Sequence, residues 1–168
     1  AILLSVQPTS PETDYGWIKS EHMNATSGSA SIHKVKGFVE KPSREHAEAL
    51  MNEGWFWNTG IVIAPAAELL RMISRAAPQL ASWFSLIPRY LGTDWEHAIV
   101  DNVYQTLPTL NFSTNILASQ CANLLMVPLR NIQWSDWGTK DRVVETLADL
   151  GQLKVSPNAG SLASVSLK

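Results

Sequence analysis

Residues 35–63 read VKGFVEKPSREHAEALMNEGWFWNTGIVI, and this stretch predicts a strand, a helix and a second strand in succession. The first strand ends at Pro42, which cannot donate to a strand ladder, and Ser43 directly after it is a good helix N-cap. The apolar residues that follow have helical spacing, and Gly54 is a natural helix terminator. The second strand contains Ile61-Val62-Ile63, a β-branched run typical of a buried strand.

Strand and helix signals alternate in the same way along most of the chain. Strands are predicted at 2–6, 15–18 and 124–129. Helices are predicted after Pro65, after an Asp94 N-cap, from Ser113 or Thr114 to about Ala122, and from Thr139 with Gly151 beyond the helix end. Small polar residues at 24–31 predict a hairpin or a mobile loop. The Ser-rich residues 156–168 predict a disordered tail after one domain of residues 1–155. Interleaved strands and helices place the chain in the α/β class.

Composition and charge narrow the classes of partner. The 168 residues, 45% of them hydrophobic, are enough to bury the core of one domain. The net charge is −2 and no basic stripe is visible, so we expect no nucleic-acid partner. No apolar stretch approaches the roughly 20 residues that span a bilayer, so we expect no membrane partner. Because residues 1–6 open the chain inside an apolar run, we expect the sequence to be the later part of a longer protein.

The single cysteine, Cys121, cannot form an internal disulfide. Its apolar surroundings favour a small buried hydrophobe over a reactive thiol. A lone unpaired cysteine indicates a reducing, cytoplasmic compartment.

Glu40 and Lys41 stand side by side where the strand before Pro42 breaks. Neighbours on a strand point to opposite faces, but a distortion at Pro42 would let both reach one ligand. Lys41 would then bind a phosphate and Glu40 a sugar hydroxyl, in charge-assisted hydrogen bonds worth about 1.5–3 kcal/mol each. The alternative is a solvated strand end with no ligand.

Asn58 and Thr59 follow the aromatic run Trp55-Phe56-Trp57 and precede a glycine. An Asn side chain both donates to and accepts from sugar hydroxyls, and the Thr hydroxyl adds a further group. The indoles would either cover a pyranose ring or pack in the core.

Two further clusters lie in predicted loops. Residues 11–16 read PETDYG and contain one candidate carboxylate, Glu12, and a glycine at the next strand, Gly16. Residues 133–139 read QWSDWGT, where Asp136 either binds a hard cation such as Mg²⁺ or accepts from backbone donors of its own turn. Since ligands gather at the carboxyl ends of strands in α/β sheets, these clusters predict one shared pocket. The four histidines, His22, His33, His46 and His97, show no metal-ligand spacing.

In this order, the clusters resemble the sugar-1-phosphate nucleotidyltransferases, and among them the mannose-1-phosphate guanylyltransferases. Those enzymes typically read Pro-Glu-Thr-Gly-Tyr-Gly-Tyr-Ile, Phe-x-Glu-Lys-Pro, Trp-Asn-Ser-Gly and Trp-Ser-Asp-x-Gly. The matching residues here are 11–18, 38–42, 57–60 and 134–138, and the resemblance runs from about Leu3 to Leu150.

The resemblance implies a Rossmann-like nucleotidyltransferase fold with a mixed, mostly parallel sheet flanked by helices. It implies that a sugar 1-phosphate, most often mannose 1-phosphate, attacks the α-phosphorus of a nucleoside triphosphate with Mg²⁺ as cofactor. The residues it places around the sugar are Glu12, Gly16, Glu40 and Asn58. Lys41 would hold the phosphate, and Asp136 would be one of two metal-binding aspartates.

The family's Gly-rich nucleotide loop and its first metal-binding Asp precede this region, and nothing in these residues replaces them. We therefore expect the chain alone to be inactive as a pyrophosphorylase, and we expect an open sheet edge that self-association covers. Two alternatives stay open: a non-catalytic ligand-binding or assembly module of the same fold, and an unrelated aromatic-rich carbohydrate-binding domain.

Overall fold

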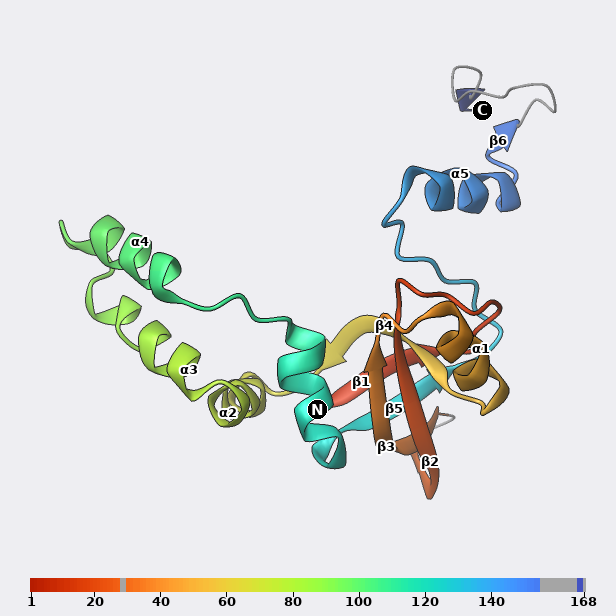
Figure 1. Ribbon diagram of the computed structural model, residues 1–168, viewed down its shortest axis with the longest axis horizontal. Coiled ribbons are helices and arrows are strands. Elements are labelled where there is room, and N and C mark those ends of the chain that lie inside the picture. Colours follow the sequence, from red (N-terminus) through yellow and green to blue (C-terminus); the bar gives the residue numbers. More distant parts are fainter. Residues whose placement is uncertain (28–29, 155–165, 168) are drawn as a thin grey trace. The chain divides into compact units, whose positions relative to one another are not determined.

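The structure is a computed structural model that describes residues 1–27, 30–154 and 166–167. The chain divides into two compact units, Ala1–Asn131 and Ile132–Lys168, and each is described by itself. Figure 1 labels the helices and strands of both.

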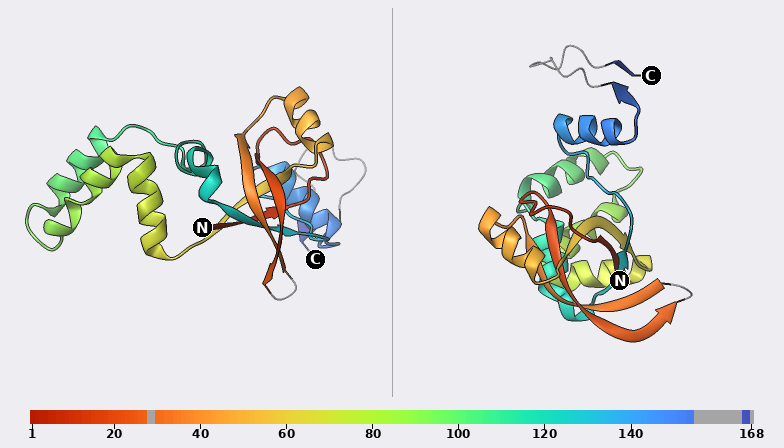
Figure 2. Two further views of the ribbon diagram at one scale, coloured as in Figure 1. Left: turned by 90° about the horizontal axis from the view of Figure 1, so that it is seen from below. Right: turned by 90° about the vertical axis from the view of Figure 1, so that its right-hand side faces the viewer.

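Five strands of the first unit form a small closed barrel in the order β1-β4-β2-β3-β5. The hairpin of β2 and β3 is the longest pair and extends past the strands on either side of it (Figure 2). The strands are β1 (Ile2–Val6), β2 (Gly16–Ser27), β3 (Ala30–Glu40), β4 (Phe56–Ile63) and β5 (Leu125–Leu129).

The expectation of a mostly parallel sheet is wrong for these strands. Only β1 and β5 pair in parallel, while β1–β4, β2–β3, β2–β4 and β3–β5 are all antiparallel. The reason is that β2 and β3 join directly as a hairpin, and β4 enters beside β2 rather than beside β3. The expected open edge is also not found among the described strands of the barrel, because the β1–β5 pairing closes it.

Helix α1 (Arg44–Asn52) follows β3 as the sequence predicts. The Ser43 side chain caps it by accepting a hydrogen bond from the His46 N–H, and Gly54, at φ 77°, follows its end. Ala47 and Leu50 are its buried face. The helix that follows Pro65 is α2 (Ala66–Ala76), and Pro78 begins the next helix, α3 (Pro78–Phe84). The short helix η1 (Ile87–Arg89) comes after α3 in the chain.

Two predicted helix starts are wrong. Helix α4 (Glu96–Thr106) has Trp95 as its N-cap, because Asp94 lies inside a turn that Thr93 holds through hydrogen bonds to Tyr90 and Trp95. The helix expected from Ser113 or Thr114 begins earlier. Asn111 caps it by accepting from the Thr114 N–H, and it continues as the π-helix η2 (Phe112–Leu117) and the 3-10 helix η3 (Ala118–Asn123).

One hydrophobic core joins the barrel to the helices beside it. Met72 on α2 and Ile116 and Leu117 on η2 meet the strands there, and Cys121 packs against this core. Burial raises the pKa of the Cys121 thiol, which fits the predicted small hydrophobe. The buried members are Leu3, Ile18, Val35, Met72, Ala77, Ile116, Leu117, Leu124 and Met126.

The second unit contains the loop before α5 (Lys140–Asp149) and the short strands β6 (Leu153–Lys154) and β7 (Ser166–Leu167), which pair antiparallel. Thr139 caps α5 by accepting from the Arg142 N–H, as predicted. Residues 156–165 and 168 of the expected tail lie outside the described residues. Ser166 and Leu167 form β7 instead.

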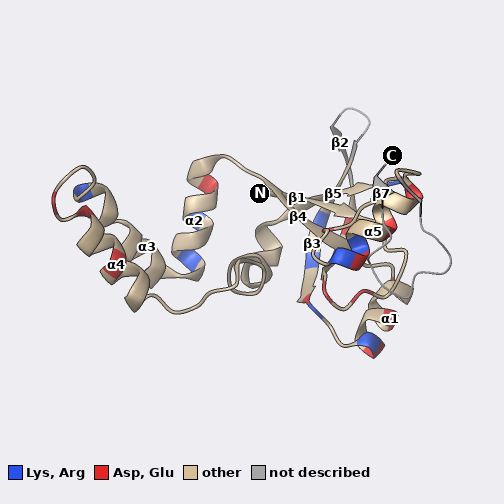
Figure 3. Ribbon diagram, turned by 90° about the horizontal axis from the view of Figure 1, so that it is seen from above, with Lys and Arg blue, Asp and Glu red and all other residues tan. Residues whose placement is uncertain are grey.

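Charged residues of both signs are interspersed along the elements (Figure 3). On α1, Arg44 pairs with Glu48, and on α2, Arg71 pairs with Glu68. Within the described residues, no helix combines the length and the apolar character needed to cross a bilayer.

Candidate functional site

Three of the predicted site residues form a row across neighbouring strands. In the strand register Gly16 stands opposite Glu40 on β3 and opposite Asn58 on β4. Directly paired residues in antiparallel strands share one face of a sheet. The row therefore places a carboxylate and an amide on either side of a glycine.

Neighbouring side chains fill the space beside the Gly16 backbone. A Cβ atom at this position would lie 2.7 Å from Oε2 of Glu40, 3.1 Å from Cζ of Phe38 and 3.3 Å from Cβ of Asn58. Any side chain here would displace the Glu40 carboxylate. The absence of a side chain at Gly16 therefore allows the Glu40 carboxylate to lie against the backbone in its observed position.

Glu40 is half-buried at the end of β3. Burial raises its pKa above the ordinary value, while the Lys41 ammonium and a hydrogen bond with Ser113 act in the opposite direction. The sequence did not point to Ser113 as a site residue, because its contact with Glu40 joins η2 to β3 across the fold. Glu40 is thus a partly desolvated carboxylate with a cation next to it in the chain.

Lys41 leaves the strand in the left-handed region, with φ 47°. This conformation is uncommon for a residue with a side chain, and a residue before proline normally stays extended. Its N–H donates to the Tyr15 carbonyl at 3.1 Å, which ties the turn to the residue before Gly16. The Lys41 side chain is exposed, and because its backbone is not extended, it does not follow the alternation of side chains along the strand. The sequence predicts a distortion of this kind beside Pro42.

Asn58 is 8% exposed, and its Oδ1 accepts from the Gly60 N–H at 3.3 Å. Thr59 does not belong to the row. Its hydroxyl donates to the Leu4 carbonyl at 2.7 Å and accepts from the Ile61 N–H at 3.3 Å, next to the irregularity in the β1–β4 pairing. The Thr59 hydroxyl therefore stabilises the backbone here, and its role toward a substrate stays a prediction.

Ser5 extends the row on the side of Asn58, its register partner on β4. The side chain is fully buried, and its Oγ has no hydrogen-bond partner among the described residues. The sequence offered no signal for Ser5, since a serine within an apolar run is common in strands.

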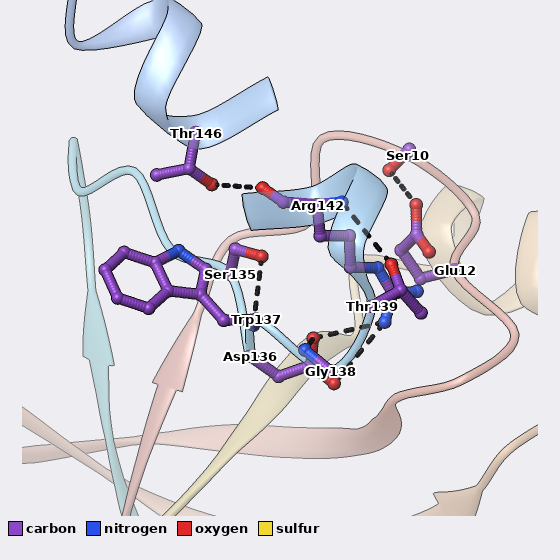
Figure 4. A network of polar contacts seen from close by, with 9 residues as sticks. All are labelled: Ser10, Glu12, Ser135, Asp136, Trp137, Gly138, Thr139, Arg142 and Thr146. Carbon is purple, nitrogen blue, oxygen red and sulfur yellow. Dashed lines mark hydrogen bonds and ion pairs between the residues drawn. The ribbon is translucent and has the colours of Figure 1, made fainter. Parts of the chain in front are cut away.

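Glu12 lies outside the row, in the loop between β1 and β2. Its carboxylate accepts a hydrogen bond from the Ser10 hydroxyl at 2.8 Å (Figure 4), and its carbonyl accepts from Nε1 of Trp17 at 2.9 Å. The Trp17 indole fixes the loop to β2. The role of Glu12 as a sugar ligand stays a prediction.

Trp57 near Asn58 packs in the core, whereas Trp55 is only partly buried. Trp57 is 4% exposed and meets Tyr15 and Trp17 edge-on, with ring centroids 5.0 and 6.1 Å away. Trp55 donates to Glu53, and the Lys19 ammonium lies 5.5 Å from its ring centroid. A separate cavity of about 220 Å³ contains none of the predicted site residues; it is lined by Gln7, Pro8, Met51, Gly54, Trp55, Phe56 and Arg130.

Asp136 belongs to the second unit. Its Oδ1 accepts from the Gly138 N–H at 2.9 Å and from Nη1 of Arg142 at 3.1 Å (Figure 4). The carboxylate therefore accepts from a backbone donor of its own turn, which is one of the two interpretations of the sequence. It also pairs with the Arg142 guanidinium. Trp137, between Asp136 and Gly138 in the chain, has φ 53°.

These contacts bear on the expected Mg²⁺. The described residues hold no group of three or more His, Cys, Asp or Glu side chains that could bind a metal ion. Asp136 supplies one carboxylate, and Arg142 bonds to one of its oxygens at 3.1 Å and the other at 3.4 Å. In the described residues the Asp136 carboxylate is thus engaged by its own turn and by Arg142.

Comparison with known proteins identifies the family of the chain. The family model described as nucleotidyl transferase matches residues 1–152. A mannose-1-phosphate guanylyltransferase from Sinorhizobium fredii is 29% identical over 144 residues, which are 84% of this chain and 27% of that protein. The alginate biosynthesis protein AlgA from Pseudomonas fluorescens is 35% identical over 80 residues, 47% of this chain and 16% of that protein.

Solved structures agree with the fold. A Thermus thermophilus protein described as a mannose-1-phosphate geranyltransferase superposes with a TM-score of 0.67 and 26% identity, over 88% of this chain and 39% of that one. A Helicobacter pylori protein described as a mannose-6-phosphate isomerase shares the fold, with a TM-score of 0.62 and 22% identity over 80% of this chain and 51% of that one. The chain thus spans about a quarter of the Sinorhizobium fredii relative. Since the family model covers nearly its whole length, the chain belongs to the nucleotidyl transferase family.

Proposed function

We propose that this chain is the sugar-phosphate-binding portion of a transferase that resembles mannose-1-phosphate guanylyltransferase. In that reaction a sugar 1-phosphate and a nucleoside triphosphate give a nucleoside-diphosphate sugar and pyrophosphate. The support from similarity is that several relatives bear that enzyme's name, and the site proposed here lies within the matched residues. We place this chemistry in the cytoplasm.

The observation that carries the proposal is the row of Glu40, Gly16 and Asn58. A carboxylate accepts from sugar hydroxyls, and an amide both donates and accepts. The absence of a side chain at Gly16 lets the Glu40 carboxylate lie beside the backbone between the two groups, and a larger residue would displace it. A pyranose bears hydroxyls on adjacent carbons, so it can bond to both groups at once.

Lys41 supplies the cation for the phosphate in this proposal. It is exposed, it follows Glu40, and its left-handed backbone frees the side chain from the strand. Glu12 and Thr59 are proposed as further contacts to the sugar. Mg²⁺ takes one or two carboxylates together with phosphate oxygens, and we propose that Asp136 supplies one carboxylate to it.

We also propose that these 168 residues do not complete the transfer by themselves. Phosphoryl transfer depends on positioning and on backbone amides or cations that stabilise the triphosphate. The sequence contains no Gly-rich phosphate loop of the kind that supplies those amides. The chain would thus bind one substrate without transferring a nucleotide to it.

Calorimetric titration with mannose 1-phosphate tests the binding proposal. We expect saturable binding by the wild-type chain and at least tenfold weaker binding by Lys41→Ala, with MgCl2 and with EDTA compared in parallel. The matched control is Lys36→Ala, since Lys36 is an exposed lysine on β3, the strand that Lys41 follows, and its ammonium pairs with Glu21. Equal weakening by both variants would indicate nonspecific charge, and no heat at millimolar ligand would reject the proposal.

An assembly module of the same fold is the second candidate, because several large apolar side chains of the first unit are exposed. Ile61 and Ile63 on β4 are 48% and 55% exposed, and Leu70 on α2 is 64% exposed. Large apolar side chains that stay exposed are candidates for burial in an interface. We propose that a second copy of the chain covers it, so that the protein is a homo-oligomer.

A further inference from the structure

We propose that His22, His33 and Ser31 form a binding site for a divalent transition-metal ion of the Zn²⁺ type. The site lies on the β2–β3 hairpin and is independent of the proposed sugar-phosphate function. The sequence shows no metal-ligand spacing among the histidines, because the two that meet are on different strands. Strand register brings His22 directly opposite His33.

Both imidazoles direct the same nitrogen at one point. Nε2 of His22 lies 3.2 Å from Oγ of Ser31, and Nε2 of His33 lies 3.1 Å from the same oxygen. The two rings lie 4.9 Å apart between centroids at an interplanar angle of 70°. Two imidazole nitrogens that converge on one oxygen supply the ligand type that Zn²⁺ prefers, at two of its four positions.

The other nitrogen of His33 is already held. Its Nδ1 lies 3.0 Å from Oγ of Ser20. A metal-binding histidine usually donates its second N–H to an orienting partner, and the Ser20 hydroxyl can accept from Nδ1 in this way, which leaves Nε2 to coordinate. With the proton on Nδ1, His33 presents the Nε2 lone pair toward Ser31 and His22.

Burial and access suit the two histidines to different roles. His33 is 6% exposed, and its ring meets Phe56 edge-on, so it is fixed in place. His22 is exposed, which leaves the convergence point open to solvent on its side. Arg130 is close enough to His33 for its charge to act on the ring.

The proposed coordination is two imidazole nitrogens, the Ser31 hydroxyl and water. Nitrogen ligands favour Zn²⁺, Ni²⁺ and Cu²⁺ over Mg²⁺, which prefers oxygen and keeps its waters. The site is therefore distinct in chemistry from the Mg²⁺ expected with a sugar phosphate. The positive charge of Arg130 opposes a cation here, so we expect affinity below that of a closed four-ligand site.

Calorimetry of the full chain with ZnCl2, in a buffer that does not bind metals, tests the proposal. We expect one Zn²⁺ per chain, at least tenfold weaker binding by His22→Asn, and no competition from millimolar MgCl2. His46→Asn and His97→Asn are matched controls, since neither histidine belongs to this cluster, and both should bind Zn²⁺ as the wild type does. Substitution of Co²⁺ should give a visible absorption band that His22→Asn removes.

Two outcomes overturn the proposal. One is Zn²⁺ binding by His22→Asn that equals the wild type, and the other is no binding at submillimolar Zn²⁺. His33→Asn and Ser31→Ala extend the test, with circular dichroism to show that each variant folds. Since His22 is exposed, the His22→Asn result decides the matter even if the buried His33 variant fails to fold.

Discussion

Lys41 combines an uncommon backbone conformation with the charge proposed to bind phosphate. Lys41→Gly and Lys41→Ala both remove the charge, but only glycine adopts a positive φ without steric cost. We expect Lys41→Gly to be more stable than Lys41→Ala by about 1 kcal/mol. Urea denaturation of the two variants measures this difference.

The same two variants, Lys41→Gly and Lys41→Ala, also distinguish the effect of the backbone conformation on ligand binding from the effect of the charge. Both variants should bind mannose 1-phosphate equally weakly if the ammonium is what the ligand contacts. Stronger binding by Lys41→Gly than by Lys41→Ala would show instead that the backbone conformation matters more than the charge. Equal stability of the two variants would contradict the left-handed turn.

Glu40 predicts a pH dependence of stability. Its pKa is raised above the unfolded value because burial disfavours the charged form, so ionised Glu40 lowers the free energy of unfolding at neutral pH. Glu40→Gln removes that cost and should be the more stable protein at pH 7. The advantage should shrink as the pH falls through the raised pKa, where Glu40 takes up its proton.

Urea titrations of the wild type and Glu40→Gln between pH 7 and pH 4 measure this advantage. Glu48→Gln is the control, because Glu48 lies on the exposed face of α1 and pairs with Arg44. An advantage of Glu40→Gln that grows toward acid pH would mean that the carboxylate stabilises the fold when charged.

At the scale of the helix, Ser43 is a cap and Asp94 is not. Ser43→Ala removes the acceptor for the His46 N–H at the start of α1 and should lower the free energy of unfolding by about 1 kcal/mol. Asp94→Ala should change it by less than about 0.5 kcal/mol, since Asp94 lies before the N-cap of α4. Thermal unfolding of both variants tests the pair, and equal losses would contradict the assignment of the caps.

The elements that could be predicted from the sequence are those with strong local signals. Helix α1 lies between a Ser cap and a Gly terminator, and the strand at Ile61–Ile63 is part of β4. The cap of η2 was missed because two asparagines hold the start of the helix. Oδ1 of Asn111 accepts from the Thr114 N–H, and the Asn111 N–H donates to Oδ1 of Asn115. In the sequence, asparagines at this spacing resemble a loop. The predicted parallel direction of the strands was wrong because the pairing partners of a strand are distant from it in the sequence.

The candidate site was predictable only as separate pieces. Glu40, Gly16 and Asn58 each stood out by residue type, but their common row depends on the strand register, which no local pattern specifies. Ser5, Ser113 and the pair of His22 and His33 gave no signal for the same reason. Their partners come from other strands or from η2.

Self-association is a prediction for the whole molecule. Ile61 and Ile63 alternate along β4 and share its exposed face. Replacing both with Thr keeps the β-branched shape and removes apolar surface. We expect the wild type to be larger than a monomer by light scattering at moderate concentration and the double variant to shift toward the monomer.

Phe112→Ser is the matched control for that experiment, since Phe112 is an exposed aromatic residue on η2, not on β4. A monomeric wild type at the same concentration would reject self-association. An oligomer that the Ile61 and Ile63 changes leave intact would place the contact on another surface.

The closure of the barrel has a consequence for the order of folding. The β2–β3 hairpin brings together residues that are close along the chain, whereas Ile2 pairs with Leu125 and Val6 with Leu129, across nearly the whole first unit. Contacts between distant residues cost loop-closure entropy before they add stability, and they slow folding. The hairpin can therefore assemble early, while the seam between β1 and β5 forms late and is the first pairing to open. Changes in β1 should act mainly on the unfolding rate, and changes in the hairpin on the folding rate.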